Sequence, residues 1–198
     1  VTAPKQFDDY DGQDLTIFEK KENWHEWQLE IYSKLFFETG TIRKADPRKI
    51  ICLYDKEGNS GKSSFFKYLF FNQPEEIGRI PYGTASQLRA SAVNIGAKSI
   101  YIIDLTRSKS NNDSPVDLLS AVEDLKNGFI TSAMFGGGQT LIMNPPHIII
   151  SSNYIFDQDL LSKDRWEILN LENNKLTDIT EKVKKREYLK KQEAALEK

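Results

Sequence analysis

Three short apolar runs constrain the fold of this 198-residue chain most strongly. They lie at Ile50–Tyr54, 99–104 and 147–153, and read IICLY, SIYIID and HIIISSN. Their apolar residues are consecutive, whereas a half-exposed strand alternates apolar and polar residues. Continuous apolar runs are typical of strands buried on both faces of a parallel sheet. The segment RWEILNL, 165–171, predicts a fourth strand.

Segments with helical character separate these strands. Apolar residues recur at three- and four-residue spacing within 17–39, and KSSFFKYLFF, TASQLRASAV and SPVDLLSAVEDLKNG are predicted helices. FITSAMFGGGQTLIM predicts two short strands around a glycine turn, and the charged residues 177–198 predict a solvated helix. Strands that alternate with helices predict an α/β fold with helices on both faces of the sheet.

The composition excludes several classes of protein. The formal net charge is −2, which argues against a generally basic surface for nucleic acid. Cys52 is the one cysteine and lies in an apolar run, so we expect a buried thiol in a reduced, intracellular protein. No apolar run approaches the roughly 18 residues of a membrane span, so no membrane partner is expected. The polar start resembles an internal linker of a longer protein.

The segment DKEGNSGKSSF, 55–65, lies between a predicted strand and a predicted helix. A strict phosphate-binding loop has its first glycine five residues before the glycine of Gly-Lys-Ser, where this chain has Lys56. We expect Gly58 to supply the missing flexibility and Lys56 to face solvent. The residues expected to bind a nucleotide are Gly58, Asn59, Ser60, Gly61, Lys62, Ser63 and Ser64. A chance Gly-Lys-Ser on a soluble surface is the alternative.

Three further polar residues fit a site that hydrolyses a nucleoside triphosphate. Lys62 would contact the β- and γ-phosphates, while Ser63 and Asp104 would hold Mg²⁺. Asn153 follows the third strand and has an amide that can orient water. Arg165 is a candidate for stabilising transition-state charge at a neighbouring subunit's γ-phosphate. The simpler interpretations are turn residues for Asp104 and Asn153, and a surface ion pair with Asp164 for Arg165.

The motifs GNSGKS, IYIIDLTR, VEDLKNG, PPHIIISSN and LSKDRW occur in this order within residues 24–172. Together they resemble the helicase part of Rep, the replication-associated protein of small circular single-stranded DNA viruses and related plasmids. The resemblance implies a P-loop AAA+ ATPase of helicase superfamily 3 with a parallel central sheet. It implies a linker and helical oligomerisation segment at 1–46, the ATPase domain at 47–173 and a charged helix or tail at 174–198.

The resemblance also implies roles for single residues. Residues 58–63 match the Walker A motif, Asp104 the Walker B acid and Asn153 the first sensor, while Arg165 matches a finger that acts across a subunit interface. Leu105 follows Asp104 where many members of the superfamily have a second acid. Glu123 and Asp113 are the candidates for that carboxylate. Arg107 would lie near the γ-phosphate or an interface.

A pore hairpin that grips single-stranded DNA is implied between the second and third strands. Its tip lacks the basic residue that the family often has. The contacts would then come from Lys126, Phe135, Gly136, Gly137, Gly138 and Gln139. A merely flexible turn is the alternative for the glycines.

The predicted function is an ATP-dependent DNA helicase that uses ATP and Mg²⁺, acts as a ring expected to be hexameric, and serves rolling-circle replication. An origin-nicking endonuclease domain would precede it in the full-length protein, because its paired histidines are not found here. The host nucleus is the expected site if the virus infects a eukaryote. The alternatives are an AAA+ ATPase that remodels protein or loads a helicase, and a nucleotide-dependent assembly module without helicase activity.

Overall fold

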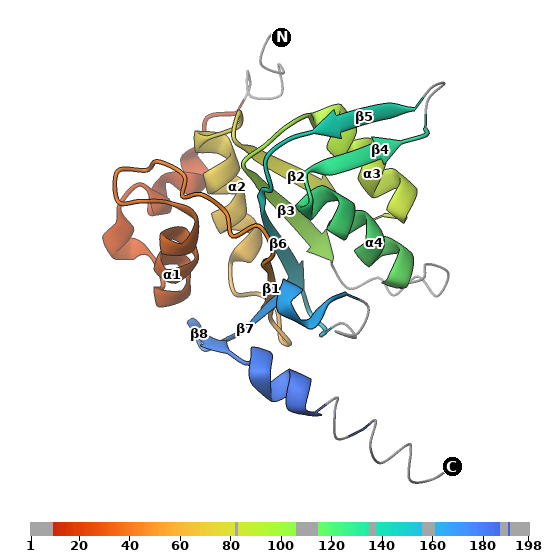
Figure 1. The fold of residues 1–198 in the computed structure, drawn as a ribbon. Helices are drawn as coiled ribbons and strands as arrows, with labels where there is room; N and C mark the ends of the chain where they lie inside the picture. The colour runs from red at the N-terminus through yellow and green to blue at the C-terminus, as the bar shows by residue number, and fades with distance from the viewer. Residues whose placement is uncertain are drawn as a thin grey trace.

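A six-stranded sheet forms the centre of the molecule (Figure 1). The computed structural model describes residues 10–81, 83–105, 115–134, 138–155, 161–186 and 190. The strand order is β2-β3-β6-β1-β7-β8, and each strand pairs in parallel with its neighbour except β8, which is antiparallel to β7. The strands are β1 (Ile50–Tyr54), β2 (Ile77–Pro81), β3 (Ile100–Leu105), β6 (His147–Ser152), β7 (Trp166–Glu172) and β8 (Lys175–Asp178). The predicted α/β class and the largely parallel sheet are confirmed.

Helices cover both faces of this sheet, as predicted (Figure 1). One face carries α1 (Glu26–Leu35), α2 (Lys62–Asn72) and the 3₁₀ helices Gln13–Phe18 and Lys21–Asn23. The other face carries α3 (Ala85–Ile95), α4 (Pro115–Lys126) and the hairpin of β4 (Phe129–Ser132) and β5 (Gln139–Ile142). A 3₁₀ turn at Lys163–Arg165 precedes β7, and helix 180–186 follows β8.

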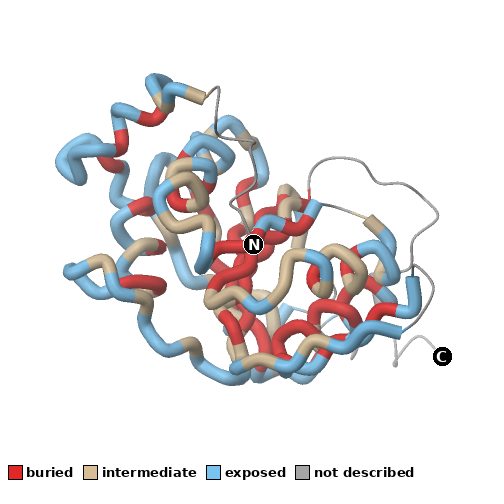
Figure 2. The backbone as a smooth tube through the Cα atoms, turned by 90° about the horizontal axis from the view of Figure 1, so that it is seen from above, coloured by how far each residue is buried: buried red, intermediate tan, exposed pale blue. Residues whose placement is uncertain are grey.

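Alternate residues of each central strand enter two separate cores. In β1, Ile51 and Leu53 pack with α1 and α2, whereas Ile50 and Cys52 pack with α3 and α4. Figure 2 shows the buried residues gathered in the middle of the molecule. Burial raises the pKa of the Cys52 thiol to about 12, which agrees with the predicted role as a small buried hydrophobe.

The segment predicted to assist oligomerisation packs on the domain itself. Trp27 and Ile31 of α1 are fully buried, and they share a core with Phe65 of α2. Trp24 and Trp27 both meet the Phe65 ring edge-on, with centroids 5.1 and 5.3 Å apart. The described part of this segment is therefore continuous with the sheet's hydrophobic core.

The structure differs from the predicted secondary structure in three places. The helix predicted over 17–39 is two 3₁₀ turns followed by the shorter α1. Strand β2 was not predicted, because its sequence, IGRIP, contains a glycine and a proline that disfavour strands. Strand β8 was not predicted, and it overlaps the charged helix predicted over 177–198 at positions 177 and 178, whereas residues 180–186 are helical as predicted. Asn173 and Asn174 both adopt positive φ, 50° and 61°, and turn the chain back along β7.

The turn between α4 and β4 depends on a glycine. Gly128 has φ of +69°, and a Cβ at this position would lie 2.1 Å from the carbonyl oxygen of Met143. The Gly128 carbonyl also accepts a hydrogen bond of 2.9 Å from the Met143 N–H. The close approach of these backbones fixes where the hairpin leaves the domain.

We expect Gly128→Ala to lower the free energy of unfolding by about 3 kcal/mol, because backbone strain and a steric overlap add together. The matched control is Gly40→Ala, where φ is +82° but the nearest atom would lie 3.7 Å from the new Cβ. That variant should lose only about 1 kcal/mol. Denaturant unfolding of both variants measures the difference, and equal losses would contradict the steric argument.

Candidate nucleotide-binding site

The loop between β1 and α2 has the backbone conformation of a tight, glycine-dependent turn. Gly58, Asn59 and Gly61 have positive φ of 75°, 61° and 79°. Lys56, at the position where a strict motif has glycine, is exposed and does not adopt positive φ. The glycines that the loop needs are therefore those at 58 and 61, and Lys56 causes no strain.

A buried carboxylate that sequence reasoning did not single out holds this loop together. Asp55 follows β1 directly and is 3% exposed. The Gly58 N–H donates to Asp55 Oδ1 at 2.8 Å, the Ser60 hydroxyl donates to Oδ2 at 2.6 Å, and the Lys62 ammonium donates to the same Oδ2. Burial raises the pKa of Asp55, but these hydrogen bonds outweigh burial and leave it below its ordinary value. The sequence signal that could have identified Asp55 is its position directly after a buried strand and before the loop.

The loop, Asp104 and Asn153 line one cleft of about 300 Å³. The parallel register explains this, since Asp104 of β3 pairs with Ser151 of β6 and Ser152 of β6 pairs with Tyr54 of β1. All three strands end at the same edge of the sheet, next to the N-terminus of α2. The described residues that line the cleft are Gly58, Asn59, Ser60, Gly61, Lys62, Ser63, Ser64, Asp104, Ser151 and Asn153.

This arrangement suits an anion beside a cation. The first N–H groups of α2 lack partners within the helix and present positive partial charge to the cleft. The hydroxyl of Ser63 and the carboxylate of Asp104 are oxygen ligands, which Mg²⁺ prefers when phosphates and water complete its shell. The side chain of Asp104 is 22% exposed and has the Arg79 guanidinium 3.8 Å away. The residues present therefore fit a magnesium–triphosphate complex.

A second cavity of about 440 Å³ adjoins the loop on the side of β7 and β8. Gly58 and Ser60 line both cavities. The turn residues Asn173 and Asn174 line this second cavity opposite the loop. The two cavities therefore leave space on both sides of the loop between β1 and α2.

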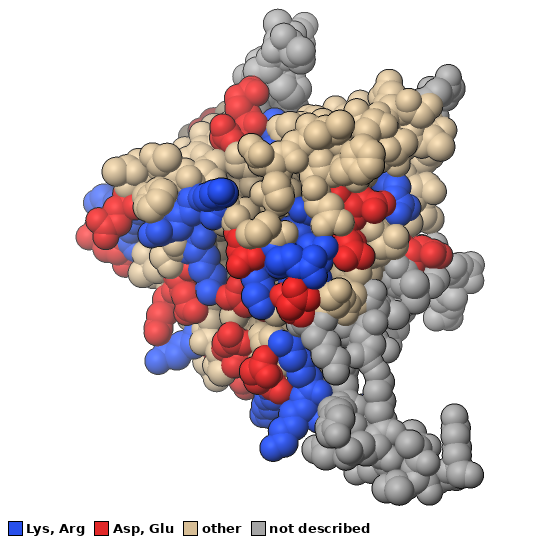
Figure 3. Space-filling view, in the orientation of Figure 1, with Lys and Arg blue, Asp and Glu red and all other residues tan. Residues whose placement is uncertain are grey.

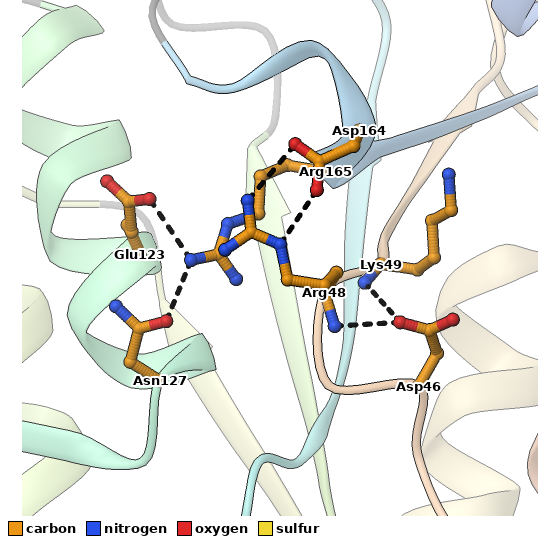
Figure 4. A network of polar contacts seen from close by, with 7 residues as sticks. All are labelled: Asp46, Arg48, Lys49, Glu123, Asn127, Asp164 and Arg165. Atoms are coloured by element: carbon orange, nitrogen blue, oxygen red, sulfur yellow. Dashed lines mark hydrogen bonds and ion pairs between the residues drawn. The ribbon is translucent and has the colours of Figure 1, made fainter.

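Glu123 and Arg165 contact each other (Figure 4), and neither lines this cleft. The Arg165 guanidinium donates through Nη2 to Glu123 Oε1 at 3.2 Å and to Asn127 Oδ1 at 2.8 Å. Its side chain is 3% exposed, and its Nε and Nη1 atoms have no hydrogen-bond partner among the described residues. The alternative interpretation of Arg165 as a surface residue paired with Asp164 is not what the structure shows, because Arg165 is buried and Asp164 binds Arg48.

Arg165 lies far from the loop between β1 and α2 of its own chain. Trp166 pairs with Ile50 at the amino end of β1, whereas the loop follows the carboxyl end of that strand. Neither Arg165 nor Glu123 lines the cleft that contains Asp104. In this arrangement Glu123 is an ion-pair partner of Arg165, and it does not stand beside Asp104 as the predicted second acid.

The prediction that Lys126 contacts DNA was wrong. Lys126 is fully buried, and its ammonium donates to the carbonyl oxygen of Pro146 at 2.6 Å. Burial lowers its pKa to about 8, although nearby Asp46 favours the charged form. A lysine at the end of an amphipathic helix is usually solvated, so its burial could not be predicted from the helical pattern.

The remaining DNA-binding predictions concern the hairpin. Gln139 begins β5 and Gly138 directly precedes it, and both are exposed. Phe135, Gly136 and Gly137 lie outside the described residues, as do Arg107 and Asp113. Residues 129–142 contain no charged side chain. Figure 3 shows Lys and Arg interspersed with Asp and Glu elsewhere on this face, and the region over the hairpin free of both.

Among the described residues, no helix combines the length and the apolar character that a membrane crossing requires.

Comparison with known proteins gives one informative similarity. Over 168 residues the sequence is 25% identical to the Master replication protein of subterranean clover stunt virus (strain F). The alignment covers 81% of this chain and 54% of that protein, so the chain spans about half the length of the curated relative that it matches. No family model matches the chain. The chain is thus similar to a viral replication protein over most of its length.

Burial of Lys126 predicts a pH dependence of stability. The folded-state pKa of about 8 lies below the ordinary value of 10.5. Between these values the unfolded chain binds more protons at this group, so the contribution of Lys126 to stability rises with pH. We expect the free energy of unfolding to rise relative to that of Lys126→Met between about pH 8 and about pH 10.5. Denaturant unfolding at a series of pH values measures this difference. A free-energy difference between the two proteins that stays constant across this window would contradict the burial of Lys126.

The arginines of Figure 4 predict a contrast between two variants. Arg165→Ala should lower the free energy of unfolding by about 2 kcal/mol, because Glu123 and Asn127 lose the buried, charged donor of their hydrogen bonds. Arg48→Ala is the control, because its ion pair with Asp164 is exposed and should contribute less than about 1 kcal/mol. Thermal and denaturant unfolding measure the stability of both variants. An Arg165→Ala chain as stable as the unaltered chain would refute the structural role of Arg165.

Proposed function

We propose that the chain is the ATPase motor of a viral Rep protein, an ATP-dependent DNA helicase. One observation carries the proposal: Lys62, Ser63, Asp104 and Asn153 line a single cleft at the N-terminus of α2. The similarity to a viral replication protein supports the biological setting. The largely parallel sheet is compatible with a P-loop fold.

Each residue of the cleft has a definite task in this proposal. The Lys62 ammonium neutralises the β- and γ-phosphates, and the loop N–H groups bind their oxygens. Ser63 and Asp104 would hold Mg²⁺, which supplies further positive charge to the phosphates when bound. Asn153 stands at the end of the neighbouring strand, where its amide can orient the attacking water toward the γ-phosphate.

Arg165 acts on a neighbouring subunit in this proposal. Its location at the amino end of β7 supports action in trans, because it cannot reach the loop of its own subunit. Its hydrogen bonds to Glu123 and Asn127 must then be released or shared when subunits assemble. In a hexameric ring, ATP would lie between one subunit's Lys62 and the next subunit's Arg165.

The hairpin of β4 and β5 is the proposed contact for single-stranded DNA. Because residues 129–142 are uncharged, the contact would depend on exposed backbone at Gly138 and on Gln139. Such a site is weak in one subunit, and a ring of copies around one strand would raise its avidity.

A nucleotide-dependent assembly module is the second candidate. Asp104 contributes the one carboxylate among the described residues that line the cleft. Glu123 binds Arg165 instead of completing an acidic pair. A site with a single acid can bind a magnesium–nucleotide complex and order a ring without efficient turnover.

We expect Lys62→Ala to reduce ATP hydrolysis at least about 100-fold, because it removes the main positive charge at the γ-phosphate. Lys67→Ala is the matched control, since Lys67 lies on the same helix but pairs with the exposed Asp14. Phosphate release measures both variants. Turnover by Lys62→Ala at the level of the unaltered chain would refute the site.

The same assay separates the two candidate functions. The helicase proposal predicts phosphate release that rises when single-stranded DNA is added, together with ATP-dependent strand separation. Nucleotide-dependent oligomers that release no phosphate would support the assembly module and exclude the motor.

A further inference from the structure

Asp55 has a buried carboxylate to which the proposed reaction assigns no task. Its side chain is 4% exposed, and it contacts the Lys62 ammonium, whose side chain is 11% exposed. The Lys62 ammonium also lies 3.3 Å from Ser60 Oγ, which itself donates to Asp55 Oδ2. The lysine that a triphosphate needs is therefore engaged by groups of its own loop.

This ion pair competes with a bound triphosphate. The Lys62 ammonium must turn from Asp55 toward the phosphates, or be shared between two anions that repel each other. Solvent screens the repulsion between Asp55 and the phosphates poorly, because the side chains of Asp55 and Lys62 are largely buried. A competing internal partner reduces the fraction of molecules that can bind and weakens the apparent affinity in proportion.

We propose that Asp55 is a positioning residue that holds Lys62 as an internal counter-ion, keeps the empty loop in its bound shape and thereby sets the affinity for nucleoside triphosphates. The inference rests on the proposed function, because it requires that Lys62 bind phosphates. The carboxylate fixes the backbone through the Gly58 N–H and releases the lysine when a phosphate replaces it.

Asp55→Asn is the sharpest variant, because an amide keeps the shape and the acceptor for the Gly58 N–H but removes the charge. We expect it to lower the dissociation constant for a non-hydrolysable ATP analogue with Mg²⁺ about fivefold. In a Lys62→Ala background the same substitution should lower the dissociation constant by a smaller factor, because it then relieves only the repulsion between Asp55 and the phosphates. Asp14→Asn controls for net charge, since Asp14 pairs with exposed Lys67. Calorimetric titration of the full chain measures all four variants.

A second measurement needs no variant. In the unaltered chain, carboxyl NMR should show the pKa of Asp55 below the ordinary range without nucleotide. Addition of the analogue should raise that pKa, because the carboxylate loses the ammonium and faces phosphates. A role confined to loop stability predicts no such change.

The outcomes separate the inference from the proposed function. Tighter binding that depends on Lys62, or the rise in pKa, supports the inference. Equal or weaker binding by a folded Asp55→Asn chain, or an unchanged pKa on binding, overturns it while the nucleotide site stands. If the unaltered chain does not bind the analogue at all, both the proposed function and the inference fail.

Discussion

The parallel pairing of β1 between β6 and β7 is the constraint on which the rest of the structure depends. It buries β1 on both faces, so Ile50 and Cys52 enter one core while Ile51 and Leu53 enter the other. The same pairing ends β1, β3 and β6 at one edge of the sheet. The edge that carries the loop between β1 and α2 therefore also carries Asp104 and Asn153, although about 90 residues separate this loop from Asn153 in the sequence.

Much of this arrangement could be predicted from the sequence. Continuous apolar runs identified three strands of the sheet, because burial on both faces leaves no polar alternation. The segment 165–171 indicated a fourth. The Gly-Lys-Ser segment and the polar residues after the neighbouring strands then indicated a common site. The carboxyl ends of parallel strands lie at one edge, so spacing along the chain was enough to bring Lys62, Asp104 and Asn153 together.

Charged residues whose partners are distant in the sequence could not be placed in this way. Lys126 looked solvated at the end of α4, but the carbonyl of Pro146 lies where its ammonium is buried. Glu123 and Arg165 lie 42 positions apart, and their ion pair depends on how α4 packs against the start of β7. Helical periodicity reports which face is apolar, but it does not report which polar groups a neighbouring strand brings to that face.

The burial of Cys52 has a practical consequence for following this molecule in solution. A thiol with a pKa of about 12 inside a packed sheet holds almost no thiolate at neutral pH and is shielded from reagents. Since Cys52 is the one cysteine in the sequence, the native chain behaves toward maleimide dyes as if it had none. A single cysteine introduced at an exposed hairpin position such as Gln139 can therefore carry a fluorophore without prior mutation of the sheet. Its emission would report whether the hairpin moves when a nucleotide is added.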